Sequence, residues 1–168
     1  MTGHPTSILV PALEKSKDPE EIKKAIAAYH TYLESVRDKL PVSAYDFAAA
    51  EWHYDYSDHR CPHDSWLESF QIHEPSTGDR HQEREIGIVI RLLGAYQDAY
   101  LELSYSKVRS YSLSGKTPVR PSGGHGNWLS DEIRLSEQGT VLHEIVFGSG
   151  SRWLIECADV EVRWVSHS

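Results

Sequence analysis

The residue types that most directly suggest chemistry lie in one short polar loop. His59, Cys61 and His63 alternate along the segment SDHRCPHD. Imidazole nitrogens and a thiolate are common zinc ligands, and a spacing of two along an extended chain places side chains on one face. A structural zinc site normally has a second ligand pair downstream, and the distant donors, His125 and Cys157 among them, form no such pair. The loop therefore predicts a zinc site at these three residues or, as the favoured alternative, a hydrogen-bonded loop.

A second candidate is the glycine-rich segment GGHGNW, residues 123–128. His125 lies between glycines, and Asp131 and Glu132 follow shortly after it. An accessible histidine beside carboxylates could act as a general base. The alternative is an incidental histidine in a flexible linker, which we favour because no complete catalytic motif is present. We therefore assign no catalytic residue and expect a binding role rather than an enzymatic one.

Length, composition and charge exclude several classes of protein. The chain has 168 residues, of which 39% are hydrophobic and 25% are charged, and this predicts one globular domain spanning residues 1–168. The formal net charge of −8 argues against nucleic acid and an anionic membrane as partners, and it permits a cationic one. Two cysteines make no disulfide framework, and no signal peptide or membrane span is recognisable. We expect a cytoplasmic protein.

The N-terminal third predicts one long helix. Residues 1–16 form an arm that is either partly disordered or packed against the body. Asp18 is a suitable N-cap, Pro19 suits the first helical position, and apolar residues recur at three- and four-residue steps up to Leu40, so an amphipathic helix is expected over residues 18–40. Residues 42–56 suit either a helix or a strand, and we favour a strand because the segment ends in aromatic residues.

In the rest of the chain, apolar and polar residues alternate with a period of two, which is typical of strands with one buried face. In the first such segment Trp66, Phe70 and Ile72 share a face. Two consecutive meanders are expected. The first has strands over residues 86–92, 100–105 and 108–114 and follows a separate strand over residues 65–73. The second has strands over residues 128–135, 141–147, 153–157 and 160–164. The predicted fold is α+β and mostly β: an antiparallel meander sheet or two-sheet sandwich, residues 42–165, covered by the N-terminal helix.

Aromatic residues are abundant, with five tryptophans, nine tyrosines and three phenylalanines. One core cannot satisfy so many tyrosine hydroxyls, so some of these rings are expected at the surface. Tyrosine is large, stiff and amphipathic, and beside carboxylates it favours protein binding. The predicted partner-binding residues are Tyr54, Tyr56, Tyr96, Tyr100, Tyr111, Trp128, Asp131 and Glu132. The alternatives are that these rings lie at the core margin or line a groove for a sugar or small ligand.

Three segments carry a resemblance: HDSWLES (63–69), VLHEI (141–145) and WLIE (153–156), together with the strands between them. Over residues 47–164 this pattern resembles small uncharacterised bacterial proteins of immunity-protein type, which belong to toxin systems. The resemblance implies an acidic cytosolic protein that covers the active site of a cognate toxin, and it transfers no functional residues.

Three functions therefore remain open. The first is a non-catalytic protein-binding module for a cationic toxin such as a nuclease. The second is a metal-dependent hydrolase that uses the loop histidines and Cys61. The third is a sandwich that binds carbohydrate or another small ligand in a concave aromatic groove.

Overall fold

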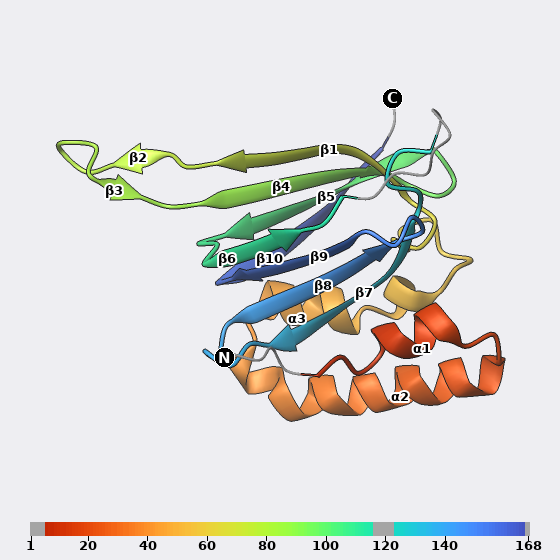
Figure 1. Cartoon of the computed structure of the whole chain (residues 1–168). Helices are drawn as coiled ribbons and strands as arrows, with labels where there is room; N and C mark the ends of the chain where they lie inside the picture. Colours follow the sequence, from red (N-terminus) through yellow and green to blue (C-terminus); the bar gives the residue numbers. More distant parts are fainter. Residues whose placement is uncertain (1–5, 116–122, 167–168) are drawn as a thin grey trace.

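The computed structural model describes residues 6–115 and 123–166, in which a helical N-terminal region precedes the strands (Figure 1). The helical elements are α1 (Val10–Lys15), α2 (Pro19–Val36), the 3-10 helix η1 (Arg37–Lys39), α3 (Val42–Ala49) and the 3-10 helix η2 (Glu51–Tyr54). The strands are β1 (Trp66–His73), β2 (Ser76–Thr77), β3 (Glu83–Arg84), β4 (Gly87–Leu93), β5 (Ala99–Ser106), β6 (Ser110–Leu113), β7 (Trp128–Leu135), β8 (Val141–Phe147), β9 (Arg152–Cys157) and β10 (Asp159–Ser166). The predicted α+β, mostly β fold class is confirmed.

Eight of the described strands form two four-stranded antiparallel sheets whose inner faces meet, and β2 and β3 form a separate two-stranded sheet. Sheet I has the order β1-β4-β5-β10, and sheet II has the order β6-β9-β8-β7. The ring of Phe70 in sheet I lies edge-on to Trp153 in sheet II, with 4.9 Å between centroids. The Tyr105 hydroxyl in sheet I is 2.8 Å from Nδ1 of His143 in sheet II. The architecture is therefore the two-sheet sandwich rather than a single meander sheet.

The predicted strand neighbours are only partly right. Strands β4 and β5 pair, and β7, β8 and β9 pair in sequence, as the alternation predicts. However, β6 leaves β5 and pairs with β9, while β10 returns to pair with β5. The chain leaves sheet I after β5 and returns to it before β10. These two points lie side by side, because the Ala158 amide donates to the Ser106 carbonyl at 3.0 Å. Lys107, the residue that follows β5, has a φ of 47°. Alternation shows which face is buried, but it does not identify the neighbouring strand.

The strand favoured for residues 42–56 is wrong, because this segment is α3 followed by η2. Ala44, Phe47 and Ala48 are the buried residues of α3, and their spacing of three and one follows a helical period. The predicted N-cap is confirmed, since the Asp18 carboxylate accepts a bond from the Glu20 amide at 3.0 Å. The expected helix over residues 18–40 is divided between α2 and the 3-10 turn η1.

The helical elements lie beside sheet II and along one side of the sandwich (Figure 1). Helix α1 packs on β7, and α3 packs beside β10 with Phe47 against the His143 ring. Within the predicted N-terminal arm, Leu9 and Val10 are fully buried, so its described part lies against the body. None of the helices in the described ranges is both long and apolar enough to cross a membrane.

Candidate functional site

The predicted zinc ligands point to three different places. Nδ1 of His59 is 2.6 Å from a carboxylate oxygen of Asp98, and Nδ1 of His63 is 2.9 Å from the Leu129 carbonyl. The Cys61 thiol instead points inward and donates to the His53 carbonyl at 3.0 Å. Across the described residues no group of three or more histidine, cysteine or carboxylate side chains is arranged to hold a metal. The metal site at His59, Cys61 and His63 is therefore not assembled, and the hydrogen-bonded loop describes this segment.

Both cysteines are buried thiols, and burial raises the pKa of each to about 12. Because the thiolate is the reactive form, we expect neither Cys61 nor Cys157 of the folded protein to react with a disulfide reagent within minutes at pH 8. Both should react once the protein is denatured. A Ser57→Cys variant, at an exposed site of the same loop, provides the accessible control. Rapid reaction of one equivalent in the native wild type would contradict this prediction.

The same loop does assemble an exposed aromatic group, which we call the loop cluster: Tyr56, His59, His63 and Tyr96. Tyr56 stacks on His63 and Tyr96 stacks on His59, each with 3.9 Å between ring centroids. The Tyr96 hydroxyl donates to the Tyr56 carbonyl at 3.1 Å, which joins the two pairs. Two predicted partner-binding tyrosines thus lie together with two predicted metal ligands.

Carboxylates surround the loop cluster. Asp98 contacts His59, and Asp64 lies 3.5 Å from His63. Asp58 accepts bonds from the Arg60 guanidinium and amide, which lower its pKa to about 2. This end of the molecule therefore combines stiff exposed rings with negative charge.

Asp131, a predicted partner-binding residue, instead lies at the centre of the core. Its carboxylate accepts bonds from His53 Nε2 at 2.9 Å, His143 Nε2 at 2.8 Å and Trp128 Nε1 at 3.0 Å. Nδ1 of His53 also lies 2.8 Å from the Phe47 carbonyl, so both nitrogens of this imidazole have a partner. Burial raises the pKa of Asp131, but the two imidazoles, His53 foremost, lower it by more than burial raises it. The pKa of Asp131 is therefore well below its usual range.

These contacts remove two residues from the predicted partner surface. Asp131 is 2% exposed and Trp128 is fully buried, so neither reaches solvent. The carboxylate and both imidazoles resemble a catalytic constellation in composition alone. All of their nitrogens and oxygens are bonded within the core, and a polar network that is fully satisfied makes a core rigid and specific.

Glu132 is also buried, on the opposite face of β7, and is not a surface residue. Its carboxylate accepts the amide of Ile8 at 2.8 Å and the amide of Val10 at 2.7 Å, which fixes the start of α1 to sheet II. Arg134 bonds to Glu132 and reaches Glu144 at 2.9 Å. The chain of charges continues from Glu144 through Arg152 to Glu14, a residue of α1.

Tyr54 faces the edge of β7 rather than a partner. Its hydroxyl donates to the Asp131 carbonyl at 3.0 Å. Two strand positions further on, the Tyr29 hydroxyl bonds both the amide and the carbonyl of Ile133 at 2.8 Å, and beyond that Tyr32 accepts from the Leu135 amide at 2.9 Å. The hydroxyl groups of these three tyrosines thus form hydrogen bonds with backbone groups along the free edge of sheet II. The sequence feature that indicates this role is the pair Tyr29 and Tyr32, three residues apart on α2.

The outer face of sheet I, in contrast, is open to solvent. From β1 to β10 its outward side chains are exposed or half-buried, and buried Gly87 is the exception. On sheet II the outward residues Glu132, Arg134 and Glu144 are buried. Helix α3 packs beside the edge strand β10, and no described helix lies on the outer face of sheet I (Figure 1).

A bulge brings Trp66 onto this open face, which corrects the expectation that it shares a face with Phe70 and Ile72. The register of β1 against β4 shifts between Leu67 and Ser69, so Trp66 pairs with Leu93, whereas Phe70 pairs with the inward-facing Ile90. Such a bulge re-aims a side chain. Trp66 is consequently 46% exposed.

Trp66 begins an apolar row that crosses all four strands of sheet I, and we call it the aromatic row. The register aligns Trp66 with Leu93, Leu93 with Tyr100, and Tyr100 with Val165. The Arg91 guanidinium lies over the Tyr100 ring at 4.0 Å. The hairpin turn that carries Tyr96 connects Leu93 to β5, so the row borders the loop cluster. Tyr100, a predicted partner-binding residue, is therefore part of the aromatic row. Trp66 is part of the row as well, although the sequence did not predict it as a partner-binding residue.

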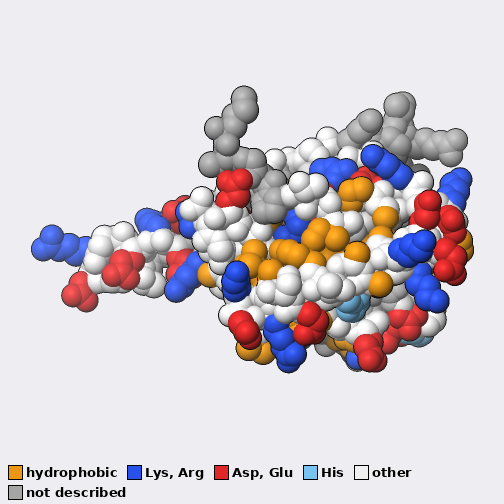
Figure 2. Space-filling view, turned by 90° about the horizontal axis from the view of Figure 1, so that it is seen from below, with side chains coloured by type: hydrophobic (Ala, Val, Ile, Leu, Met, Phe, Trp, Pro, Cys, Tyr) orange, Lys and Arg blue, Asp and Glu red, His pale blue; other side chains and the backbone are white. Residues whose placement is uncertain are grey.

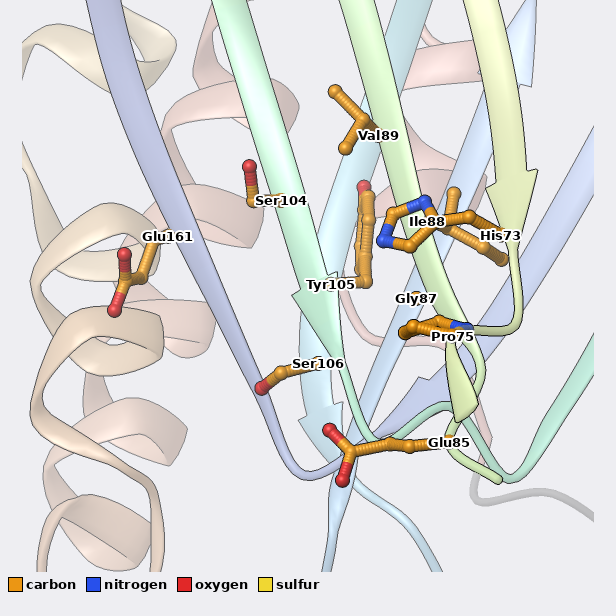
Figure 3. A pocket seen from close by; sticks show the side chains of 10 residues that line it. All are labelled: His73, Pro75, Glu85, Gly87, Ile88, Val89, Ser104, Tyr105, Ser106 and Glu161. Carbon is orange, nitrogen blue, oxygen red and sulfur yellow. The ribbon is translucent and has the colours of Figure 1, made fainter. Parts of the chain in front are cut away.

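At its other end the open face meets a projecting arm, residues 74–85, built on β2 and β3. The arm extends from the body and carries side chains of both charges (Figure 2). A groove of about 320 Å³ lies at its base (Figure 3). The lining includes His73, Pro75, Glu85, Val89, Ser104, Ser106 and Glu161.

The remaining predicted residues lie elsewhere. Tyr111 is on β6, at the edge of sheet II, and is 44% exposed. His125 packs against Phe147 and Trp153 with centroid distances of 5.5 Å to each ring. Neither residue is part of the open face.

No protein-family model matches the chain, and no curated protein or solved structure matches it either. The functional argument therefore depends on the geometry of the open face and its borders.

Proposed function

We propose that the protein is a non-catalytic binding module of immunity-protein type, which uses the open face of sheet I to cover a cationic toxin. The observation that carries this proposal is the asymmetry between the sheets. The helices and the N-terminal segment cover the outer face of sheet II, while sheet I presents an aromatic row to solvent. In this row Trp66 is 46% exposed, and Leu93, Tyr100 and Val165 are half-buried. Apolar surface that is exposed and rimmed by polar groups is typical of an interaction site.

The borders of the open face suit such a partner. Stiff aromatic anchors supply most of the binding energy in protein interfaces, and Trp66 and Tyr100 have this character. The carboxylates around the loop cluster and the net charge of −8 would accelerate encounter with a basic protein. The buried His53, Asp131 and His143 are fully bonded to one another and their neighbours, which favours binding over catalysis.

The two alternatives have less support. A metal-dependent hydrolase would need the loop ligands to converge, and they diverge. A carbohydrate site would need exposed rings along a concavity, whereas Tyr105, the aromatic residue that lines the groove beside the arm, is 2% exposed.

Binding to the product of a neighbouring toxin gene tests the proposal. We expect Trp66→Ala to weaken this binding by about 30-fold or more, the loss typical of a central aromatic anchor. Tyr111→Ala is the matched control, since its ring is similarly exposed but lies on sheet II. Calorimetry on folded variants gives the dissociation constants, and rescue of cells from the toxin gives the biological readout.

Two results would contradict the proposal. One is the absence of binding between the protein and any neighbouring gene product at low salt. The other is a loss of binding in Val42→Asp with no loss in Trp66→Ala. Val42 is 76% exposed at the start of α3, so that result would place the interface on the helical side.

A further inference from the structure

We propose that two copies of the chain pair through the free edge of β1, so that sheet I of one copy continues into sheet I of the other as one antiparallel sheet. The surface concerned is the edge of sheet I rather than its open face, so this pairing does not depend on the toxin proposal. It adds a second interaction surface to the molecule.

The two sides of the sandwich differ in what covers their edge strands. On one side α3 packs beside β10 and contacts β7, and tyrosine hydroxyls bond the backbone of β7. On the other side the edge strands are β1 and β6. Asn127 bridges Trp66 at the start of β1, but over residues 69–73 the second edge of β1 pairs with no strand in the described part of the chain. Its outward amides and carbonyls can therefore bond a further strand.

This edge carries none of the residues that commonly prevent edge strands from pairing. Natural edge strands are protected by lysine, by proline or by an inward-pointing charge. Residues 69–73, SFQIH, contain no lysine, arginine, proline or carboxylate. Two copies that each carry a net charge of −8 repel each other, so a contact between them favours an uncharged surface of this kind.

Apolar side chains at the margin of the core are exposed along the same side. Ile72 of β1 pairs with the buried Ile88 and faces sheet II, yet it is 43% exposed. Leu113 of β6 pairs with the buried Trp153 and faces sheet I, yet it is 37% exposed. A strand of a second copy beside β1 would remove part of this apolar surface from water, which is the main driving force for association.

The segment is self-complementary about Gln71. When two identical strands pair antiparallel about a two-fold axis, residues equally distant from the axis face each other. With Gln71 on the axis, Phe70 of each copy faces Ile72 of the other on the inner side, and Ser69 faces His73 on the outer side. An aromatic residue opposite a β-branched one is a stabilising cross-strand pair, and the two glutamine amides on the axis can bond each other.

The flanking residues confine the pairing to this segment. At one end Pro75 has no amide hydrogen, and at the other Asn127 already occupies the edge at Trp66. Glu68 would face Glu74, and like charges directly opposite each other disfavour any extension. Because the axis is perpendicular to the sheet, both open faces point to the same side, and each copy keeps its aromatic row.

Sedimentation equilibrium of the full chain tests the pairing. We expect a reversible rise in mass from one chain toward two as the concentration increases from about 1 to about 500 μM. Gln71→Lys should raise the dissociation constant about tenfold or more, because it places two like charges on the axis at an exposed position. Ser104→Lys adds the same charge at an exposed position of β5, away from the edge, and should change the dissociation constant by less than about twofold.

Disulfide trapping locates the contact. Both native cysteines are buried, so an added thiol on the surface is the accessible one. With diamide as the oxidant, Gln71→Cys should form a covalent dimer about tenfold faster than Ser57→Cys does at equal concentration, because the axis holds its two thiols together.

The pairing is refuted by a single-chain mass at every concentration, or by a dimer that Gln71→Lys leaves unchanged or that Ser104→Lys weakens equally. Equal trapping rates for Gln71→Cys and Ser57→Cys also refute it. The toxin proposal fails separately, since it requires a neighbouring gene product that binds the protein. A dimer without any such product supports the pairing and removes the toxin, whereas a single-chain protein that binds the product does the reverse.

Discussion

Asp131→Asn is expected to destabilise the fold by about 3–5 kcal/mol, the usual cost of breaking a buried ion pair by removing one partner. The substitution removes the carboxylate that both buried imidazoles contact, so His53 and His143 lose their negatively charged partner. It also replaces one acceptor oxygen by an amide donor that faces the donors of His143 or Trp128. Urea denaturation followed by tryptophan fluorescence measures the loss.

The chain offers a matched control for this prediction. His59 and Asp98 form a second histidine–carboxylate pair at 2.6 Å, but both side chains are about half exposed. Asp98→Asn should therefore change the free energy of unfolding by at most about 1 kcal/mol. The prediction is wrong if the urea midpoint of Asp131→Asn lies as close to that of wild type as the midpoint of Asp98→Asn does. In that case the buried contacts of Asp131 do not stabilise the fold.

The pH dependence of stability gives an independent check. The pKa of Asp131 is lowered in the folded state, so the unfolded chain binds its proton first as the pH falls. The stabilisation from Asp131 is complete above the unfolded pKa of about 4 and is lost progressively at lower pH. Wild type should therefore lose more stability between pH 5 and pH 3 than Asp131→Asn does, in urea titrations at each pH.

The sequence predicted local features better than neighbours in space. The capping pattern at Asp18 and the alternation of β4 and β5 each depend on residues close in the chain, and the structure agrees with them. In β8, by contrast, both faces are buried. The strand favoured for residues 42–56 is wrong because aromatic residues at its end were weighted above the helical spacing of Ala44 and Phe47. Tertiary packing decided that segment, as it often does where propensities are balanced.

The candidate site was only half predictable for a similar reason. Tyr56 and Tyr96 are exposed and Tyr100 is half-buried, whereas Asp131 and Glu132 are buried. Carboxylates in a strand normally indicate a solvated face. Here Asp131 contacts His53 of η2 and His143 of β8, and Glu132 pairs with Arg134 of its own strand, partners that the strand pattern does not reveal. A bulge of one residue, which no pattern in β1 reveals, decides that Trp66 is exposed.

The outer faces of the two sheets differ because the N-terminal elements lie on one of them. On sheet II, Glu132 and Arg134 are occupied by the start of α1, and the free edge of β7 is occupied by tyrosine hydroxyls. On sheet I, α3 packs beside the edge strand β10, but no described helix lies on the outer face. The chain thus closes the outer face of β7 and β8 and leaves that of sheet I open to solvent, as one face of an antiparallel sheet commonly is.

Arg134→Met is the second large effect we expect, with a loss of about 3–5 kcal/mol and release of α1 from sheet II. Arg134 is 2% exposed and joins Glu132 to Glu144, so its removal leaves two buried carboxylates with less compensation. Hydrogen exchange at the Leu9 and Val10 amides should accelerate before global unfolding, because these amides depend on Glu132.

Two further variants separate charge from packing. Arg152→Met removes the half-exposed arginine of the same chain of charges and should cost about 1 kcal/mol. Combining Arg134→Met with Glu132→Gln and Glu144→Gln should recover part of the loss, because replacing all the charges leaves none unpaired. If Arg134→Met alone leaves amide exchange at Val10 unchanged, α1 is fixed by its apolar contacts and the ion pairs are dispensable. If the combined variant is no more stable than Arg134→Met, the shape of the guanidinium in the packing, rather than its charge, is what sheet II requires.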